Sequence, residues 1–183
     1  MSLYFVTGNR NKLREIQLLL PHVEQRDLDL VEIQEIDAHK VIQAKLQEAF
    51  THAENNSFEF IVEDTSLYLD CMNGLPGPFI KWFLQAVGAM GLAHIAQCCG
   101  NDKATARTII GYASSPQDIH FFEGAIHGSI VLPRGESGFG WDPIFLPDGY
   151  DKTFSQMSIE EKFSISMRRQ AVEKLKTYLE SKG

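Results

Sequence analysis

Residues 3–20 read LYFVTGNRNKLREIQLLL, and the character of this stretch changes from strand-like to helix-like within a few residues. The run Leu3–Thr7 is typical of a strand. A Gly8-Asn9 turn follows, and from Lys12 to Leu20 the apolar residues recur at helical spacing. The segment therefore predicts a β-strand that turns sharply into an amphipathic helix, an arrangement typical of α/β proteins.

The rest of the chain continues this alternation and then changes it. The expected elements are a helix over residues 41–53, a short buried strand over 60–62 that ends at Glu63-Asp64, a loop over 74–78, a helix over 79–87, strands over 104–113 and 121–132, an irregular stretch over 133–149 and a helix over 165–179. Strands and helices alternate early and two long strands come late. We therefore expect an α/β fold, with a mixed β-sheet flanked by helices. Since no repeat or linker interrupts the chain, we expect a single domain over residues 1–183.

Composition narrows the functional classes. Of the 183 residues 44% are hydrophobic, which is enough for a sizeable core, and the net charge is −7. This charge argues against a nucleic-acid polymer as partner, but a few lysines and a divalent cation can still hold a small phosphate ligand. Neither a membrane-spanning run nor a signal peptide is visible, so we expect a cytoplasmic protein without a membrane partner. The three cysteines and six histidines show no disulfide or zinc spacing.

The first candidate motif is the strand-to-helix junction Thr7-Gly8-Asn9-Arg10-Asn11-Lys12. Such a junction offers backbone N–H groups and the positive end of a helix dipole, which suit a phosphate group. Lys12 adds a positive charge. An ordinary turn with a polar helix start explains the same residues equally well, so this motif alone does not decide.

The second candidate motif is Glu63-Asp64-Thr65, directly after the buried run over residues 60–62. Carboxylates at the carboxyl end of a strand lie where α/β proteins place ligands. They are able to bind Mg²⁺ or to act as a general base. A solvated strand end is the alternative.

Three further motifs lie in the second half of the chain. A stiff loop, GLPGP over residues 74–78, delivers Lys81 and Trp82 to the start of a helix. The loop Gly138–Pro143 places aromatic side chains between glycines, which suits stacking on a base or simply packs a tight turn. Lys162 and Arg168 lie on opposite sides of a possible turn, although a charged helix face is the commoner meaning of such a run.

The order and spacing of these motifs are more specific than any one of them. Together, TGNxxK, EDT, GLPGPFIKW, FGWDP and a C-terminal EK followed by SxR resemble the inosine triphosphate pyrophosphatase family over nearly the whole chain. The resemblance implies an elongated mixed α/β fold with two lobes around a central cleft, and a homodimer. It also implies an enzyme that hydrolyses non-standard purine nucleoside triphosphates (ITP, dITP and XTP) to the monophosphate and pyrophosphate, cleansing the nucleotide pool.

The resemblance also implies roles for individual residues. Asp64 binds the metal and serves as the catalytic base, and Glu32 is a second metal ligand, with Glu63 as a further candidate. The metal is Mg²⁺, in one or more ions, with Mn²⁺ as a substitute. The residues expected to contact the substrate are Thr7, Gly8, Asn9, Arg10, Asn11, Lys12, Lys45, Thr65, Lys81, Phe139, Gly140, Trp141, Asp142, Lys162, Met167 and Arg168.

One position departs from the family pattern. The chain has Ser166-Met167-Arg168 where the family usually has Ser-His-Arg, and Met167 lacks the donor that a histidine offers to the 6-keto oxygen of the base. This departure motivates one alternative, the same pyrophosphatase chemistry with an altered or relaxed base preference. A second alternative comes from another class, a nucleotide-binding protein that does not hydrolyse its ligand. The acidic metal residues weigh against the second alternative.

Overall fold

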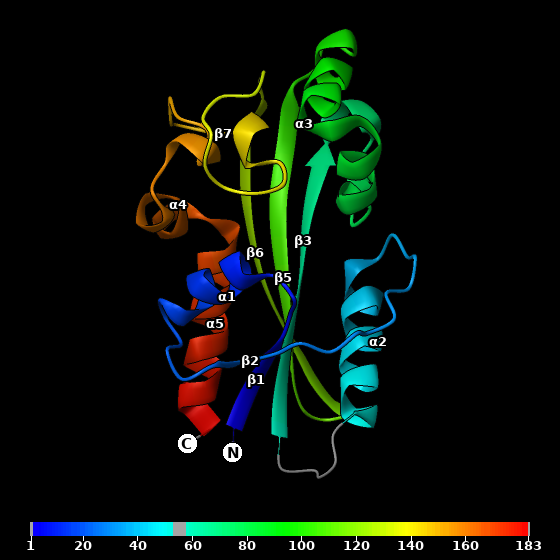
Figure 1. Ribbon diagram of the computed structural model, residues 1–183, viewed down its shortest axis with the longest axis vertical. Coiled ribbons are helices and arrows are strands. Elements are labelled where there is room, and N and C mark those ends of the chain that lie inside the picture. Colours follow the sequence, from blue (N-terminus) through cyan, green and yellow to red (C-terminus); the bar gives the residue numbers. More distant parts are fainter. Residues whose placement is uncertain (1, 53–57, 183) are drawn as a thin grey trace. The chain divides into compact units, whose positions relative to one another are not determined.

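A computed structural model of the chain describes residues 2–52 and 58–182. The strands are β1 (Ser2–Val6), β2 (Glu24–Arg26), β3 (Phe58–Leu69), β4 (Pro76–Gly77), β5 (Lys103–Ser115), β6 (Asp118–Ile130) and β7 (Phe145–Pro147). The α-helices are α1 (Arg10–Gln17), α2 (Ala38–Thr51), α3 (Ile80–Cys98), α4 (Ile159–Ile165) and α5 (Met167–Lys182), and short 3₁₀ turns cover Asp70–Met72, Asp142–Ile144 and Phe154–Gln156 (Figure 1).

The described strands form one mixed sheet in the order β2-β1-β3-β5-β6-β7, with β4 paired to β3. Strand β1 runs parallel to both β2 and β3. Strands β4 and β7 run antiparallel to β3 and β6. The expected α/β class with a mixed sheet and flanking helices is therefore confirmed.

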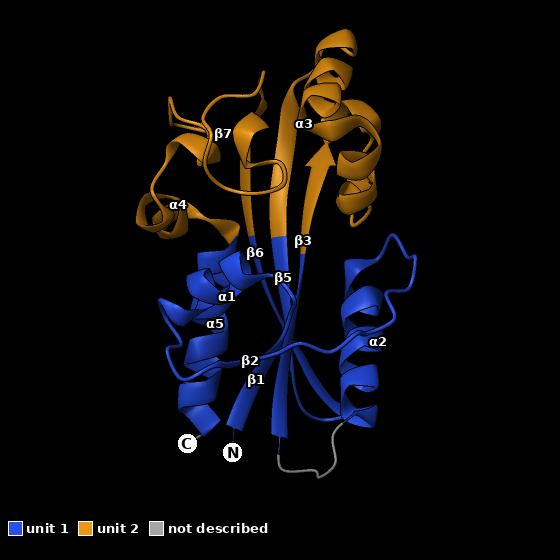
Figure 2. Cartoon of the chain, viewed as in Figure 1, with its two compact units in different colours: residues 1–64, 108–124, 168–183 blue, residues 65–107, 125–167 orange. Residues whose placement is uncertain are grey.

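Two compact units divide the chain (Figure 2). Unit 1 comprises Met1–Asp64, Thr108–Gly124 and Arg168–Gly183, and unit 2 comprises Thr65–Arg107 and Ala125–Met167. The long strands β3, β5 and β6 each contribute residues to both units. The expected single domain and the expected central cleft stay predictions.

In unit 1, helices cover both faces of the strands, with α1 and α5 on one face and α2 on the other (Figure 1). Successive strand residues point to opposite faces, and β3 follows this rule. Ile61 packs with the residues of α1 and α5, whereas Phe60 and Val62 pack with those of α2. Helix α2 lies so close to β5 that a Cβ at Gly111 would collide with Ile42 and Leu46. Unit 1 therefore has an apolar layer on each face of its strands.

The core of unit 2 gathers apolar side chains from the carboxyl-terminal half of β3, from α3 and from the segment around β7. Leu67 and Leu69 are fully buried there. Helix α3 continues beyond the expected end at residue 87, with a break at Gly88, whose φ is 68°. The helix resumes because Leu92, Ala93 and Ala96 bury a second apolar face. None of the described helices is long and apolar enough to cross a membrane.

The expectation that the third strand ends at Glu63-Asp64 is wrong, because β3 spans 12 residues and continues to Leu69. The two carboxylates interrupt the apolar run without ending the strand. Both residues are buried, with exposed fractions of 7% and 9%. Charged residues are buried in a strand interior only where neighbouring groups compensate their charge.

Other boundaries moved less. Helix α1 starts and ends earlier than expected, and the expected last residue of the second helix, Ala53, lies outside the described residues. The stretch 133–149 is mostly irregular but contains the short strand β7. The C-terminal helix expected over residues 165–179 is α5, which begins at Met167, and a further short helix, α4, precedes it and ends at Ile165. Lys162 and Arg168 consequently lie on different helices, as the expected turn between them implied.

Candidate active site

The loop between β1 and α1 is built by its own side chains. Asn9 caps α1, and its Oδ1 accepts hydrogen bonds from the backbone N–H groups of Asn11 (3.0 Å) and Lys12 (3.3 Å). The Thr7 hydroxyl accepts a third, from the N–H of Asn9 (3.0 Å). The sequence predicted N–H groups available for a phosphate, but three of them shape the loop, because Asn and Thr side chains favour such local caps. The caps place Arg10 and Lys12 in the first turn of α1.

Lys12 belongs to a buried group of charged side chains in unit 1. Its Nζ lies 3.1 Å from Oε1 of Glu63, whose side chain is fully buried. Arg168, also fully buried, donates to Glu63 through Nε (2.7 Å) and Nη2 (3.0 Å), and its Nη1 donates to Glu15. Burial alone would lower the pKa of the Arg168 guanidinium, but the charges of Glu63 and Glu15 and their hydrogen bonds raise that pKa above its ordinary value. The arginine therefore stays charged.

Reasoning from the sequence did not include Glu15 in this group. Glu15 lies in α1 with an exposed fraction of 4%, beside the fully buried Ile16. The available signal was spacing, because Glu15 follows Lys12 by three positions and such residues share one face of a helix. That spacing is also typical of an exposed ion pair, so only the fold distinguishes the two cases.

Glu63 and Asp64 cannot act as the adjacent pair that the sequence suggested. Neighbouring residues of a strand point to opposite faces of the sheet. Glu63 shares its face with Ile61 and reaches Lys12 and Arg168 of α1 and α5. Asp64 therefore belongs to the opposite face, the one that α2 covers.

The α2 face carries two more of the predicted residues. Lys45, in α2, forms an ion pair and hydrogen bond with the Glu32 carboxylate. The side chain of Lys45 is 15% exposed and that of Glu32 is 35% exposed. Among the described residues no cluster of three or more potential metal ligands is formed. The acidic groups on this face that the sequence singled out are therefore Asp64 on β3 and Glu32, which is paired with Lys45 of α2.

Of the residues expected to contact the base, unit 2 holds Phe139, Gly140, Trp141 and Asp142, whereas Arg168 lies in unit 1. The Nζ of Lys162 lies 2.8 Å from Oδ2 of Asp142, and both side chains are nearly fully buried. The same Oδ2 accepts a hydrogen bond from the N–H of Phe139 (2.9 Å). Trp141 is 6% exposed and packs edge-on against Phe145, so it is a core residue, whereas Phe139 is half-buried. Phe139 is therefore the better candidate for stacking on a base.

Tight turns around Phe139 require glycine. Gly138 and Gly140 adopt φ values of 85° and 65°, which other residues rarely adopt. A Cβ at Gly138 would also lie 2.5 Å from Oδ2 of Asp142. The glycines thus allow the loop to close over the buried carboxylate.

The remaining candidates are more scattered. Lys81 and Trp82 start α3, and both are exposed, with the Lys81 Nζ 5.5 Å from the centroid of the Trp82 ring. Thr65 is half-buried in β3. Met167 is 1% exposed and packs in the apolar core of unit 2, while its neighbour Arg168 belongs to unit 1.

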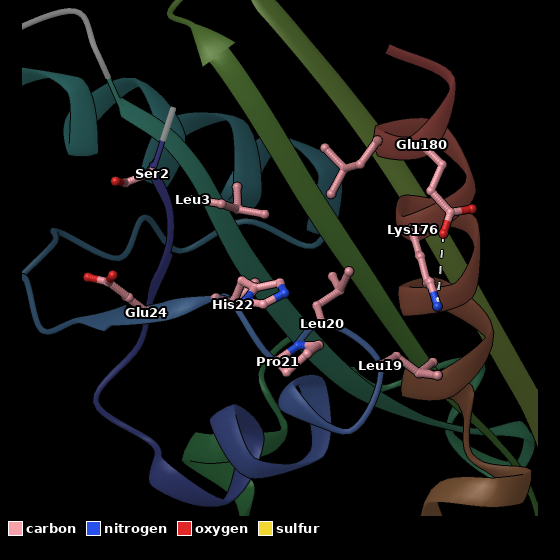
Figure 3. A pocket seen from close by; sticks show the side chains of 11 residues that line it. Ser2, Leu3, Leu19, Leu20, Pro21, His22, Glu24, Lys176 and Glu180 are labelled. Atoms are coloured by element: carbon pink, nitrogen blue, oxygen red, sulfur yellow. Dashed lines mark ion pairs between the residues drawn. The ribbon is translucent and has the colours of Figure 1, made fainter. Parts of the chain in front are cut away.

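A cavity of about 530 Å³ lies elsewhere in unit 1 (Figure 3). It is lined by β1, by the connection from α1 into β2, and by the last turns of α5, where Lys176 and Glu180 form an ion pair at 3.9 Å. Leu3, Leu20 and Leu179 make part of its apolar wall. None of the residues expected to bind substrate or metal lines it.

Comparisons with known proteins agree with the order of the motifs. The model of the Ham1 family matches residues 3–178. An inosine triphosphate pyrophosphatase of Kluyveromyces lactis is 41% identical over 190 residues, covering 100% of this chain and 97% of that protein. Another, from Schizosaccharomyces pombe, is 41% identical over 184 residues, covering 98% and 96% of the two chains. A HAM1 protein structure from Coxiella burnetii has a TM-score of 0.81 at 24% identity, covers 98% of both chains, and supports the fold.

Proposed function

Because the chain belongs to the Ham1 family, we propose that it hydrolyses non-standard purine nucleoside triphosphates, such as ITP, to the nucleoside monophosphate and pyrophosphate. The observation that carries this proposal is the match to inosine triphosphate pyrophosphatases at about 40% identity along the whole chain. The enzyme is a hydrolase of a phosphoanhydride bond.

The arrangement of unit 1 supports a phosphate-handling role. Lys12 stands in the first turn of α1, where its positive charge adds to that of the helix dipole. A triphosphate bound at this loop gains a charge-assisted hydrogen bond from the ammonium group. Lys45, on the α2 face, is the second lysine that we assign to the triphosphate. Stabilisation of charge on the phosphate oxygens supplies most of the catalysis in reactions of this kind.

The family generally uses a divalent metal, and we propose that it is Mg²⁺ here. The donor chemistry fits, since Asp64 and Glu32 are carboxylates and Mg²⁺ is usually bound by one or two carboxylates together with waters and substrate phosphates. When bound, the ion would neutralise negative charge on the phosphate oxygens. Glu63 fits less well, because Lys12 and Arg168 already engage both of its oxygens.

We propose that Asp64 activates the attacking water. Its carboxylate orients the water toward the α-phosphorus and accepts its proton as the P–O bond forms and pyrophosphate leaves. In unit 2, we propose that Phe139 stacks on the purine base of the substrate, and that Lys162 and Asp142 hold the loop of Phe139 in place. We further propose that the enzyme is a cytoplasmic homodimer, which light scattering after gel filtration would test.

The direct test is pyrophosphate release from ITP by the full chain, with Mg²⁺ and with excess EDTA. We expect release that depends on the metal, and a much smaller kcat/KM for ATP and GTP than for ITP and XTP. Tight binding of ITP without pyrophosphate release would contradict the proposal, and so would equal turnover of all these nucleotides.

A further inference from the structure

Both carboxylate oxygens of Glu63 are engaged by cations. Oε2 accepts from Nε of Arg168, while Oε1 accepts from Nη2 of Arg168 and also lies 3.1 Å from Nζ of Lys12. The paired contacts with Arg168 match the planar fork of a guanidinium, an arrangement that a lysine ammonium cannot reproduce. The Glu63 carboxylate therefore has one defined orientation.

Arg168 itself is held from a second side. Its Nη1 donates to Glu15, which stands in α1 together with Lys12. Counted together, the four side chains carry two positive and two negative charges, so the group is neutral although most of it is buried. Neutrality matters because an unpaired buried charge is strongly destabilising. The network thus links β3, α1 and the start of α5 through charged contacts.

Lys12 is the member of this network that reaches outward. Its side chain is 19% exposed, compared with 0% for Glu63, 1% for Arg168 and 5% for Glu15. A ligand at the loop 7–12 would meet the ammonium group of Lys12, with Glu63 immediately behind it. The position of that ammonium group then depends on a carboxylate that the ligand does not touch.

We propose that Glu63 is a positioning residue that sets the Lys12 ammonium for the triphosphate, and that Arg168 and Glu15 hold Glu63 in place. The inference rests on the proposed function insofar as Lys12 is taken to contact phosphate. It replaces the expectation that Glu63 helps to bind the metal. It also gives Arg168 a role at the phosphate end of the substrate through Glu63.

A double-mutant cycle tests the inference without turnover. The binding of inorganic tripolyphosphate is measured by calorimetry in EDTA for the wild-type chain, Lys12→Met, Glu63→Gln and the double variant. We expect Glu63→Gln to raise Kd about tenfold in the wild-type background, the scale of one charged hydrogen bond. In the Lys12→Met background it should raise Kd by less than about twofold, because the residue through which it acts is gone.

Two further variants keep the test decisive. Arg168→Lys retains the positive charge but loses the fork, and we expect it to weaken tripolyphosphate binding in the same way as Glu63→Gln. It replaces Glu63→Gln in the cycle if circular dichroism shows that the glutamine variant does not fold. The matched control is Arg169→Gln, which removes an exposed pair with Glu173 next to the network and should leave Kd unchanged.

The outcomes separate this inference from the proposed function. An equal effect of Glu63→Gln in both backgrounds, or no loss of binding in Lys12→Met, would overturn it. Unchanged tripolyphosphate binding together with a higher half-saturating Mg²⁺ concentration would instead make Glu63 a metal ligand. A wild-type chain that binds tripolyphosphate with the expected coupling but does not release pyrophosphate from ITP would contradict the proposed function alone.

Discussion

The ammonium nitrogen of Lys162 lies 2.8 Å from Oδ2 of Asp142, and both side chains are almost inaccessible to solvent. The same nitrogen stands 4.4 Å from the centroid of the Phe139 ring, and the same Oδ2 accepts the Phe139 N–H. One ion pair therefore fixes both the backbone and the ring of the residue that we assign to the base.

Replacing Lys162 by methionine should leave the Asp142 carboxylate buried without its cation. Removing one partner of a buried pair typically costs about 3–5 kcal/mol, so we expect a loss of that size in the free energy of unfolding measured with urea. The control is Lys152→Met, which breaks an exposed pair with Glu161 and should cost less than about 1 kcal/mol. Equal losses for the two variants would show that burial does not determine the strength of the Lys162 pair.

Asp64→Asn should remove the proton acceptor while keeping the shape of the side chain. We expect kcat for ITP to fall about a hundredfold or more, the scale of general-base catalysis, while ITP binding measured by calorimetry largely survives. The control is Glu35→Gln, which alters a partly exposed carboxylate that accepts hydrogen bonds from the backbone N–H groups of residues 36 and 37. Retained metal-dependent turnover in Asp64→Asn would exclude Asp64 as the base.

Asp118 should contribute stability that acid removes. Hydrogen bonds from Ser114 and His120, followed by Lys182, lower the pKa of its carboxyl to about 2. Since the folded pKa lies below the unfolded value of about 3.9, the contribution is complete above about pH 4 and is lost as the pH falls toward about 2. The side chain is 42% exposed, so the contribution at neutral pH is less than about 1 kcal/mol.

This pH dependence is measurable as the difference in unfolding free energy between the wild-type chain and Asp118→Asn. We expect a small positive difference at pH 7 that disappears near pH 2. A difference that grew on acidification would have the wrong sign for a carboxyl with a lowered pKa.

Met167→His would introduce the histidine that the family resemblance implies at this position. The side chain of Met167 is buried in the apolar core of unit 2, where an imidazole loses its contacts with water. We expect the variant to lose about 1–3 kcal/mol of stability in thermal or urea unfolding, the cost of burying a polar group without a partner. Met167→Leu is the control and should cost less than about 1.5 kcal/mol. An unchanged stability for the histidine variant would mean that a polar partner is available there.

The fold class followed from local patterns because these patterns reflect short-range physics. The strand-turn-helix at residues 3–20 and the apolar periodicity of the later segments are set by neighbours along the chain, and the mixed sheet was predicted from them. The error at Glu63-Asp64 has a definite cause. The hydrophobicity pattern predicted that the strand ends where a carboxylate follows the apolar run. Here the positive charges of Lys12 and Arg168, on two helices that are far from β3 in sequence, compensate the charge of Glu63, so the strand continues.

For the candidate site, the sequence predicted several of the residues but not the contacts between them. The loop 7–12, Lys162 and Asp142 were singled out from residue types and spacing, but neither the Lys162–Asp142 pair nor the membership of Glu15 was visible. Trp141 and Phe139 looked equivalent in the sequence, and only packing shows that Trp141 is a core residue. The assignments of Phe139, Trp141 and the other candidate residues as substrate contacts stay predictions.

By itself the sequence determined the turn at Gly8-Asn9 and the glycines around Phe139, since each depends on residue types within a few positions, and the order of its motifs along the chain indicated the family. Tertiary structure alone decided which charges meet. The strand places Glu63 and Asp64 on opposite faces, and the fold brings Arg168 to Glu63 across 105 positions of the chain. Such pairing follows from where the elements pack, because electrostatic compensation acts through space and leaves no periodic trace in the sequence.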